Sequence, residues 1–227
     1  MYFDYYYLIL VVPTLILSMI AQIIVKSTFS KYSQIRCSRG ITGRDAALVL
    51  MKSNSINDVT VEQVSGALTD HYDPGAKKLR LSDPVFAQPS IAAVGVAAHE
   101  TGHAIQHNTG YGPLVLRSTL VPAANIGSSF GPWLAIAGIF FQIPLLIDIG
   151  IVFFGAAVLF YIITLPVEFD ASARALAILK SNNVLTGEEL NGVKKVLSAA
   201  ALTYVASALT AIMSFLRLIL ISRGRRR

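Results

Sequence analysis

Charge is scarce in this sequence. Of its 227 residues only 14% are charged and 54% are hydrophobic, whereas a soluble domain carries about 25% charged residues. This deficit excludes an ordinary water-soluble domain and predicts an integral membrane protein. The formal net charge is +6, but the basic residues lie between apolar stretches and at the C-terminus. That placement is typical of membrane orientation, so we expect a lipid bilayer as partner and no nucleic acid.

Cysteine and histidine are also rare. The single Cys37 excludes an internal disulfide and a cysteine-based metal site, and its neighbours do not predict an activated thiolate. The sequence has only 4 histidines, so few imidazoles are available for a metal. Two of them, His99 and His103, lie in the segment His99-Glu-Thr-Gly-His103.

This segment has the pattern His-Glu-x-x-His within an alanine- and valine-rich run that starts near Ser90. In a helix, His99 and His103 project from one face and suit a single Zn²⁺. Glu100 can reach a zinc-bound water without binding the metal itself. Because zinc lowers the pKa of that water to about 7, the carboxylate can take its proton as it attacks a carbonyl. We predict a zinc hydrolase with His99 and His103 as ligands and Glu100 as base; a helix with two chance histidines is the alternative.

The apolar stretches predict about four transmembrane helices. The first, Tyr5–Val25, spans roughly 30 Å as a helix. Lysine and arginine follow it rather than precede it, which favours an uncleaved anchor with its N-terminus outside. Leu114–Phe141 and Leu145–Pro166 predict a membrane hairpin that returns the chain to the cytoplasmic side.

The fourth apolar stretch, Ser198–Ile221, is rich in small residues that suit close helix packing. If it crosses the membrane, the basic tail lies outside, against the positive-inside rule. It therefore either crosses or lies along an interface with Arg217 snorkelling, and both interpretations stay open. The tail comprises Arg223, Arg225, Arg226 and Arg227.

The polar segment 26–113 predicts a small cytoplasmic lobe. Thr42-Gly-Arg-Asp45 is typical of a capping box and opens a helix over Ala46–Ser53. Three alternating segments and the turn residues Asp73-Pro-Gly75 predict a short antiparallel sheet. The last of these strands, which leads into the zinc helix, presents an edge that either binds an extended peptide or only covers that helix. The expected strands are Val59–Val64, Ala67–Tyr72 and Lys77–Ser82.

A catalytic zinc usually takes three protein ligands, and the hairpin returns Glu168 and Asp170 to the cytoplasmic side. Glu168 completes a His-His-Glu set like that of thermolysin, with Asp170 as second choice. Three ligands on one short helix would strain the geometry, which argues against His107. The longer metzincin pattern fails because Gln106 and Thr109 replace its glycine and histidine.

The predicted fold is an α-rich integral membrane protein with about four transmembrane helices. Its cytoplasmic lobe is a small zincin-like α+β unit with a short antiparallel sheet and a His-Glu-x-x-His helix. Thr186-Gly-Glu-Glu189 predicts a second capping box and a further short helix. The expected segments are an anchor (1–25), the lobe (26–113), the hairpin (114–166), cytoplasmic helices with the third ligand (167–198), and a C-terminal membrane helix with its tail (199–227).

Taken together, these motifs resemble the YugP family of neutral zinc metallopeptidases, which are bacterial membrane proteins. The resemblance implies Zn²⁺ bound by His99, His103 and Glu168, with Glu100 as catalytic base. More distantly, the order of elements is similar to the HtpX and CAAX-processing membrane proteases. Those relatives place an acid where this chain has Ser172, so Asp170 is a candidate to orient a zinc histidine instead. The resemblance also rests on three further segments: Asp70-His-Tyr-Asp-Pro74, Leu165-Pro-Val-Glu-Phe-Asp-Ala-Ser172 and Ala200-Ala-Leu-Thr-Tyr-Val205.

The predicted function is zinc-dependent hydrolysis of peptide bonds in membrane or membrane-associated proteins, in a multi-pass cell-membrane protein whose active site is cytoplasmic. Tyr204 and His71 are candidate donors to the developing oxyanion. The alternative is a non-catalytic membrane scaffold in which zinc clips the lobe to the hairpin. Glu100 favours catalysis, because a structural zinc site has no use for a base there.

Overall fold

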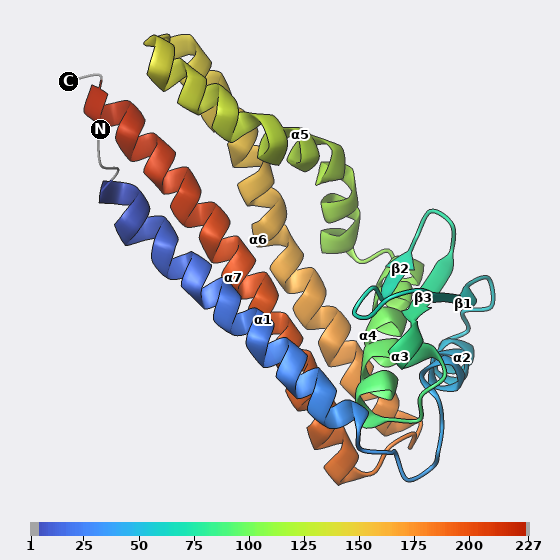
Figure 1. The fold of residues 1–227 in the computed structure, drawn as a ribbon. Helices are drawn as coiled ribbons and strands as arrows, with labels where there is room; N and C mark the ends of the chain where they lie inside the picture. Colours follow the sequence, from blue (N-terminus) through green and yellow to red (C-terminus); the bar gives the residue numbers. More distant parts are fainter. Residues whose placement is uncertain (1–4, 226–227) are drawn as a thin grey trace. The chain divides into compact units, whose positions relative to one another are not determined.

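The computed structural model describes residues 5–225, and Figure 1 shows their path. The chain forms two compact units. The first contains the N-terminal part up to Gln22, Val115–Pro166 and the part from Leu202 onward. The second contains Ile23–Leu114 and Val167–Ala201. Arg226 and Arg227 of the predicted basic tail lie outside the described residues.

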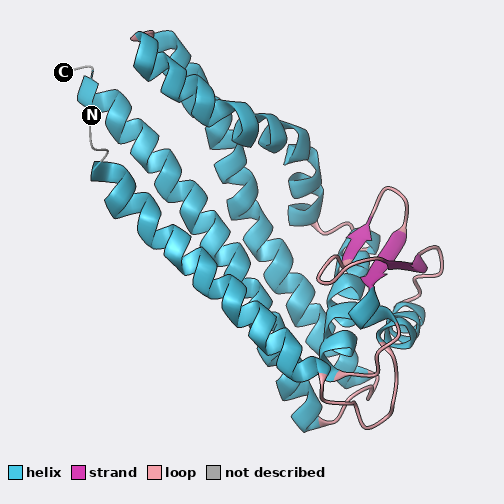
Figure 2. Cartoon of the chain, in the orientation of Figure 1, coloured by secondary structure: helices cyan, strands magenta, loops and turns pink. Residues whose placement is uncertain are grey.

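Four long helices dominate the secondary structure, as the apolar stretches predict (Figure 2). Each is long and apolar enough to cross a bilayer. The first begins with a π-helical turn, η1, at Tyr7–Val11. The four are α1 (Val12–Ser33), α5 (Gly112–Phe141), α6 (Pro144–Ser181) and α7 (Gly187–Arg225).

Two of these helices run further than the sequence predicts. The third apolar stretch was expected to end at Pro166, yet α6 continues through it to Ser181. A proline removes one backbone hydrogen bond, and long membrane helices tolerate this loss. A short helix was likewise expected before Ser198, but α7 is continuous from Gly187. No proline interrupts α7, so once the Thr186 capping box starts the helix, nothing ends it early.

Glycines bring α5 and α6 into backbone contact in the first unit. A Cβ atom on Gly131 would lie 2.7 Å from the nitrogen of Phe154, and one on Gly150 would lie 2.4 Å from that of Ala135. Small residues of this kind let membrane helices approach closely. Helix α5 ends at Phe141, and the next residue, Gln142, has a left-handed φ of 60°. The Ile143 nitrogen then donates to the Gly138 carbonyl at 2.9 Å.

Helices α1 and α7 also contact each other within the first unit. The Ser18 and Thr210 hydroxyl oxygens lie 3.3 Å apart. The Arg217 guanidinium lies over the ring of Tyr7, 5.3 Å from its centroid, at cation–π distance. Arg217, for which snorkelling was one of two open interpretations, thus has an aromatic partner on the neighbouring helix.

The second unit carries the sheet, whose order is β1-β3-β2. The strands are β1 (Thr60–Val64), β2 (His71–Asp73) and β3 (Lys78–Ser82). β2 pairs with β3 antiparallel, as predicted, but β1 pairs with β3 parallel, so the prediction of an antiparallel sheet is wrong for β1. β2 and β3 form a tight hairpin, which leaves the other edge of β3 for β1. The prediction of a free edge on Lys77–Ser82 is therefore wrong, because β3 is the central strand. Alternation identifies strands, but it does not identify their partners.

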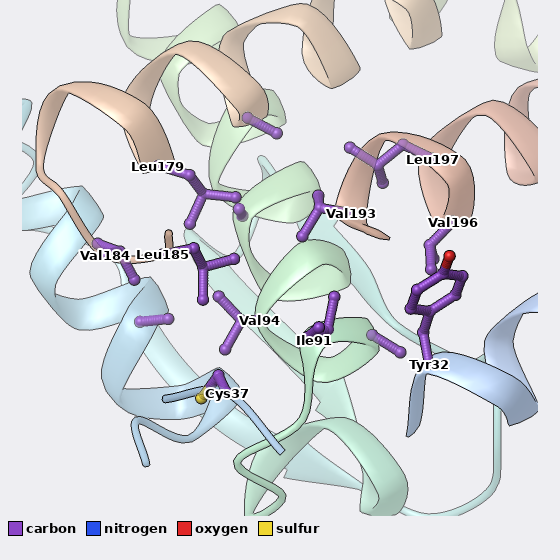
Figure 3. Close-up of a cluster of buried hydrophobic side chains, with 14 of the residues drawn as sticks. Tyr32, Cys37, Ile91, Val94, Leu179, Val184, Leu185, Val193, Val196 and Leu197 are labelled. Atoms are coloured by element: carbon purple, nitrogen blue, oxygen red, sulfur yellow. The ribbon is translucent and has the colours of Figure 1, made fainter. Parts of the chain in front are cut away.

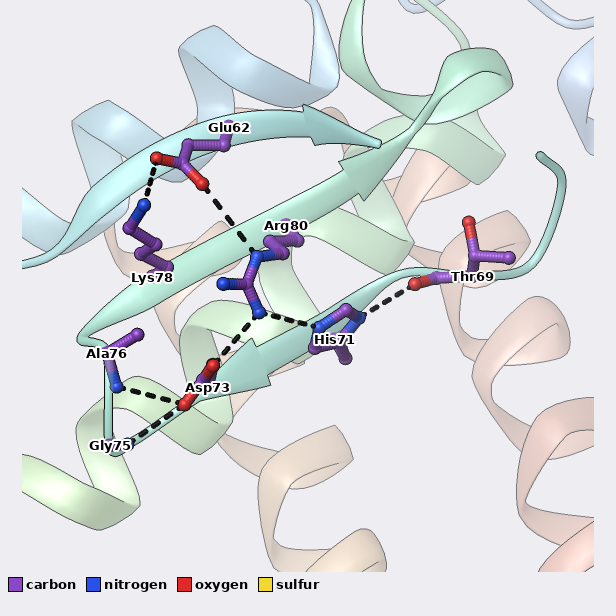
Figure 4. Close-up of polar contacts among 8 residues, drawn as sticks. All are labelled: Glu62, Thr69, His71, Asp73, Gly75, Ala76, Lys78 and Arg80. Carbon is purple, nitrogen blue, oxygen red and sulfur yellow. Dashed lines mark hydrogen bonds and ion pairs between the residues drawn. The ribbon is translucent and has the colours of Figure 1, made fainter. Parts of the chain in front are cut away.

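A network of polar side chains covers the sheet (Figure 4). The Asp73 carboxylate accepts hydrogen bonds from the backbone nitrogens of Gly75 and Ala76 at 3.0 Å each, which fixes the predicted turn. Its other oxygen pairs with Arg80 at 2.9 Å. Arg80 also lies 3.8 Å from Glu62 on β1, so its side chain links all three strands.

Helix α4 (Ile91–Asn108) is the centre of the second unit. It begins where Ser90 caps it, with the Ala93 nitrogen donating to the serine hydroxyl at 3.1 Å. One hydrophobic cluster packs α4 against α6, α7 and α2 (Gly43–Ser53), and Figure 3 shows it. A second cluster packs α4 against α2, β3 and the short helix α3 (Asp83–Phe86). The many alanines let neighbours approach α4 from both sides.

Asp70 holds the end of β3 in place. Its carboxylate accepts hydrogen bonds from the backbone nitrogen of Ser82 at 2.7 Å and from the Ser82 hydroxyl at 2.8 Å. Burial raises the pKa of Asp70 above its ordinary value of 3.8, although both hydrogen bonds oppose the shift. The folded protein therefore binds this proton more tightly than the unfolded chain does.

Substituting Asp70→Asn should raise the melting temperature at pH 7, because the amide keeps both contacts with Ser82 and buries no charge. A raised carboxyl pKa means that Asp70 favours folding increasingly as the pH falls from neutral towards 3.8. The advantage of the Asp70→Asn variant over the wild type should therefore shrink on acidification. Thermal unfolding of both proteins in detergent at several pH values measures this, and a lower melting temperature for Asp70→Asn at pH 7 would contradict it.

Candidate metal centre

Helix α4 places His99 and His103 one turn apart on the same face. Their ring centroids lie 4.8 Å apart with the rings nearly perpendicular, at 82°. His103 and Glu100 are buried, with exposed fractions of 8% and 7%, and His99 is half-buried. The predicted pair of imidazoles is thus on one side of a well-packed helix, with Glu100 beside it.

Glu168 comes from α6 and meets both histidines. One oxygen of its carboxylate lies 3.3 Å from Nε2 of His99 and 3.6 Å from Nε2 of His103. One ligand atom from each of the three residues lies within 4.8 Å of the others. In a tetrahedral zinc site with bonds of about 2.0–2.2 Å, ligand atoms are about 3.4 Å apart. The spacing and the two-nitrogen, one-oxygen donor set therefore fit Zn²⁺.

Gly102 explains how α6 comes close enough. A Cβ atom at this position would lie 2.5 Å from the backbone oxygen of Ala171 on α6, much closer than real side chains approach backbone atoms. Only glycine fits here without moving one of the helices. Ala171 is three residues beyond Glu168, so this contact sets the distance from Glu168 to the histidines.

Each histidine has a second hydrogen bond on the side of its ring away from Glu168. Nδ1 of His99 lies 3.2 Å from the hydroxyl of Ser172. Nδ1 of His103 lies 2.9 Å from the amide oxygen of Gln106. Such contacts orient metal-binding imidazoles and tune their basicity. Ser172 thus takes the orienting position on α6 with a neutral hydroxyl.

Asp170, which the sequence suggested as a direct partner of a zinc histidine, instead reaches His103 through Gln106. Its carboxylate accepts hydrogen bonds from the Gln106 amide nitrogen at 2.8 Å and from Nε of Arg174 at 2.6 Å. It therefore supports His103 through Gln106. Sequence reasoning missed Gln106, which entered only as a departure from the metzincin pattern. Its position three residues after His103 was the available signal, because such residues are neighbours on a helix.

Carboxylates dominate the electrostatics of the site. Burial alone would lower the pKa of His103, but the hydrogen bond with Glu168 and the charges of Glu100 and Glu168 outweigh it and raise the pKa above its ordinary value. Glu168 itself is only 3% exposed. A buried environment that favours positive charge also favours a divalent cation.

His71, another candidate from the sequence, is not among the three clustered residues. On β2, the ring nitrogens of His71 lie 2.9 Å from the Thr69 carbonyl and 3.2 Å from the Arg80 guanidinium (Figure 4). Since arginine can only donate, Nε2 of His71 accepts and Nδ1 donates to Thr69. Tyr204 lies on α7 in the first unit, whereas the three candidate ligands lie in the second. Its role as an oxyanion donor stays a prediction.

His107 continues the α4 face and contacts the sheet. Its Nδ1 lies 2.8 Å from the hydroxyl of Tyr72 on β2. Burial raises the pKa of Tyr72 to about 12, so its phenol stays protonated at physiological pH. This contact holds β2 next to α4, one turn beyond His103. Sequence reasoning singled out neither Tyr72 nor this contact.

Replacing Gly102 with alanine should separate α4 from α6 and weaken zinc binding by about tenfold or more, because the added Cβ overlaps a backbone atom. Gly112→Ala is the matched control, since a Cβ atom there meets no atom within 4 Å. Chelator competition on both purified proteins, alongside their melting temperatures, measures the effect. Wild-type zinc affinity in Gly102→Ala would contradict the role assigned to this glycine.

Comparison with known proteins agrees with this centre. The family described as "Putative neutral zinc metallopeptidase" matches residues 7–223. A protein of Bacillus subtilis (strain 168) named "Putative membrane protease YugP" is 48% identical over 215 residues, which are 95% of this chain and 96% of that protein. No solved structure matches the chain. The chain belongs to the family of neutral zinc metallopeptidases that includes YugP.

Proposed function

We propose that this protein is a zinc endopeptidase that cleaves membrane or membrane-associated proteins at the cytoplasmic membrane surface. The observation that carries the proposal is a buried carboxylate, Glu100, next in sequence to His99, which belongs to a three-residue set able to hold zinc. Three protein ligands leave a fourth position for water or substrate, as catalytic sites do. Membership of a zinc metallopeptidase family supports the peptide bond as substrate.

The residues divide the chemistry between binding and proton transfer. Bound zinc supplies a Lewis acid that polarises a carbonyl and acidifies water. His99, His103 and Glu168 would hold the ion, since Nε2 of each histidine faces one carboxylate oxygen of Glu168. Glu100 follows His99 directly, so its carboxylate takes the proton of the attacking water and returns it to the departing amine nitrogen. Because Glu100 is buried, bulk water is excluded from its carboxylate, and electrostatic interactions there are stronger than in water.

Strand β2 is the proposed binding surface for the substrate backbone. It lies at an edge of the sheet, and the hydrogen bond between Tyr72 and His107 holds it beside α4. An extended peptide can add to such an edge through backbone hydrogen bonds. This arrangement would bring successive peptide bonds of the substrate near the zinc helix, and binding would depend little on the substrate's side chains.

The distribution of basic residues supports a multi-pass protein with its metal centre on the cytoplasmic side. The loop between α5 and α6, at Gln142–Ile143, contains no lysine or arginine, so we place it outside. The polar segments that flank the metal centre are rich in both. These residues include Lys26, Lys31, Arg36, Arg39, Arg44, Lys180, Lys194 and Lys195.

Substituting Glu100→Gln should preserve zinc content and lower kcat/KM by about 10²–10⁴-fold, because the amide cannot take a proton. Cleavage of an unfolded model protein in detergent, with zinc quantified in the same samples, measures both effects. Glu62→Gln is the matched control, since it makes the same exchange in the sheet, where Glu62 pairs with Lys78. If all three proteins bind zinc and none cleaves a broad substrate panel, the scaffold hypothesis replaces the protease proposal.

Cysteine labelling tests the orientation. Cys37 is buried, and Cys37→Ser provides a background for single cysteines at Ile143 and Ser181, which are both exposed. In intact cells, a membrane-impermeant maleimide should label Ile143→Cys, whereas Ser181→Cys should react only after permeabilisation. The reverse pattern would place the metal centre outside.

A further inference from the structure

We propose that Gln106 is a positioning residue that fixes the ring orientation and tautomer of His103 and thereby sets the affinity of the site for zinc. This inference rests on the metal centre described above. It adds a residue to which neither the family description nor the pattern of the zinc motif assigns a role.

The orientation of the Gln106 amide is determined by its partners. Its nitrogen lies 2.8 Å from the backbone carbonyl oxygen of Val167 and 2.8 Å from a carboxylate oxygen of Asp170. Both atoms can only accept, so both must face the NH₂ group of the amide. Turning the amide over would set its oxygen against two other oxygens. The amide oxygen must therefore face His103.

This orientation fixes the tautomer of His103. The amide oxygen lies 2.9 Å from Nδ1 of His103, and because that oxygen can only accept, Nδ1 must carry the proton. In a neutral imidazole, the lone pair is then on Nε2. Nε2 is the atom that faces Glu168 at 3.6 Å. Gln106 thus keeps the proton on Nδ1 of His103 and leaves Nε2 as the nitrogen available to the metal.

His99 lacks an equivalent constraint. Its Nδ1 lies 3.2 Å from the hydroxyl of Ser172, and a hydroxyl can either donate or accept. Ser172 is therefore compatible with both neutral tautomers of His99. Of the two zinc histidines, only His103 has a partner at Nδ1 that can solely accept and so assigns Nε2 to the metal.

A chain of contacts holds the amide itself. Gln106 is fully buried, with an exposed fraction of 0%, and a buried amide is costly unless its polar atoms have partners. Asp170, which accepts from the amide, is held by Nε of Arg174 at 2.6 Å. The Arg174 guanidinium lies 5.5 Å from the ring centroid of Tyr111. The backbone nitrogen of Tyr111 donates to the Gln106 carbonyl at 2.9 Å, so the chain of contacts closes on the residue where it began.

The test compares zinc affinity among variants of the full-length protein in detergent. Gln106→Met keeps the size of the side chain but removes the acceptor, and it should raise the zinc Kd by about 10–100-fold. Thr101→Val is the matched control on α4: Thr101 is equally buried, and its hydroxyl donates only to its own helix, to the Ala97 carbonyl at 2.8 Å. We expect its zinc Kd to stay within about twofold of the wild type.

Two further readouts separate positioning from a structural role. The melting temperature without metal reports whether Gln106 only ties α4 to α6, and the visible spectrum of the Co²⁺-loaded protein reports ligand geometry. We expect Gln106→Met to change the Co²⁺ spectrum and Thr101→Val to leave it unchanged. A Gln106→Met protein that melts lower but keeps the wild-type zinc Kd and Co²⁺ spectrum would overturn the proposal.

Asp170→Ala provides a second arm should Gln106→Met fail to fold. The Val167 carbonyl still fixes the amide in this variant, so the zinc Kd should rise by only about twofold to tenfold. An unchanged Kd, or a rise well beyond about tenfold, would contradict the orientation argument.

His103→Ala separates this inference from the proposed function. If His103→Ala leaves zinc binding intact, the metal centre itself is wrong. If His103→Ala abolishes zinc binding while Gln106→Met and Asp170→Ala do not alter it, only the role of Gln106 fails.

Discussion

The metal centre depends on the backbone contact between α4 and α6. Two ligands come from α4 and the third from α6, so the three-residue set is lost if the helices move apart. Gly102 permits the contact, because a Cβ atom there would lie 2.5 Å from the Ala171 oxygen. The lack of a Cβ atom at Gly102, between the two histidines of the motif, thus decides whether Glu168 can reach them.

The two zinc histidines beside this contact have different hydrogen-bond partners at Nδ1. His103 receives an acceptor of fixed orientation from Gln106, whereas His99 receives the adaptable hydroxyl of Ser172. A neutral acceptor raises the basicity of an imidazole less than a carboxylate would. The charged acceptor in this network is Asp170, which contacts Gln106 rather than His103 and forms an ion pair with Arg174. Two buried carboxylates, Glu100 and Glu168, instead provide the negative field that attracts a divalent cation.

Much of this centre could be predicted from the sequence, because the zinc motif combines a fixed spacing with a helical period. Glu168 followed from the need for a third ligand and the return of the hairpin. The continuity of α6 through Pro166 did not, since the cost of a helix proline depends on its surroundings. The parallel pairing of β1 was also missed, because alternation carries no information about strand partners. Gln106 escaped notice because its role depends on acceptors more than sixty positions away in the chain.

The position of bound zinc tests the central claim most directly. Anomalous diffraction at the zinc edge, from crystals of the purified protein, locates the ion without assumptions about activity. We expect one zinc ion bonded to Nε2 of His99, Nε2 of His103 and the carboxylate of Glu168, at about 2.0–2.2 Å from each. A zinc ion bound elsewhere, or bound by the two histidines with Glu168 turned away, would contradict the account.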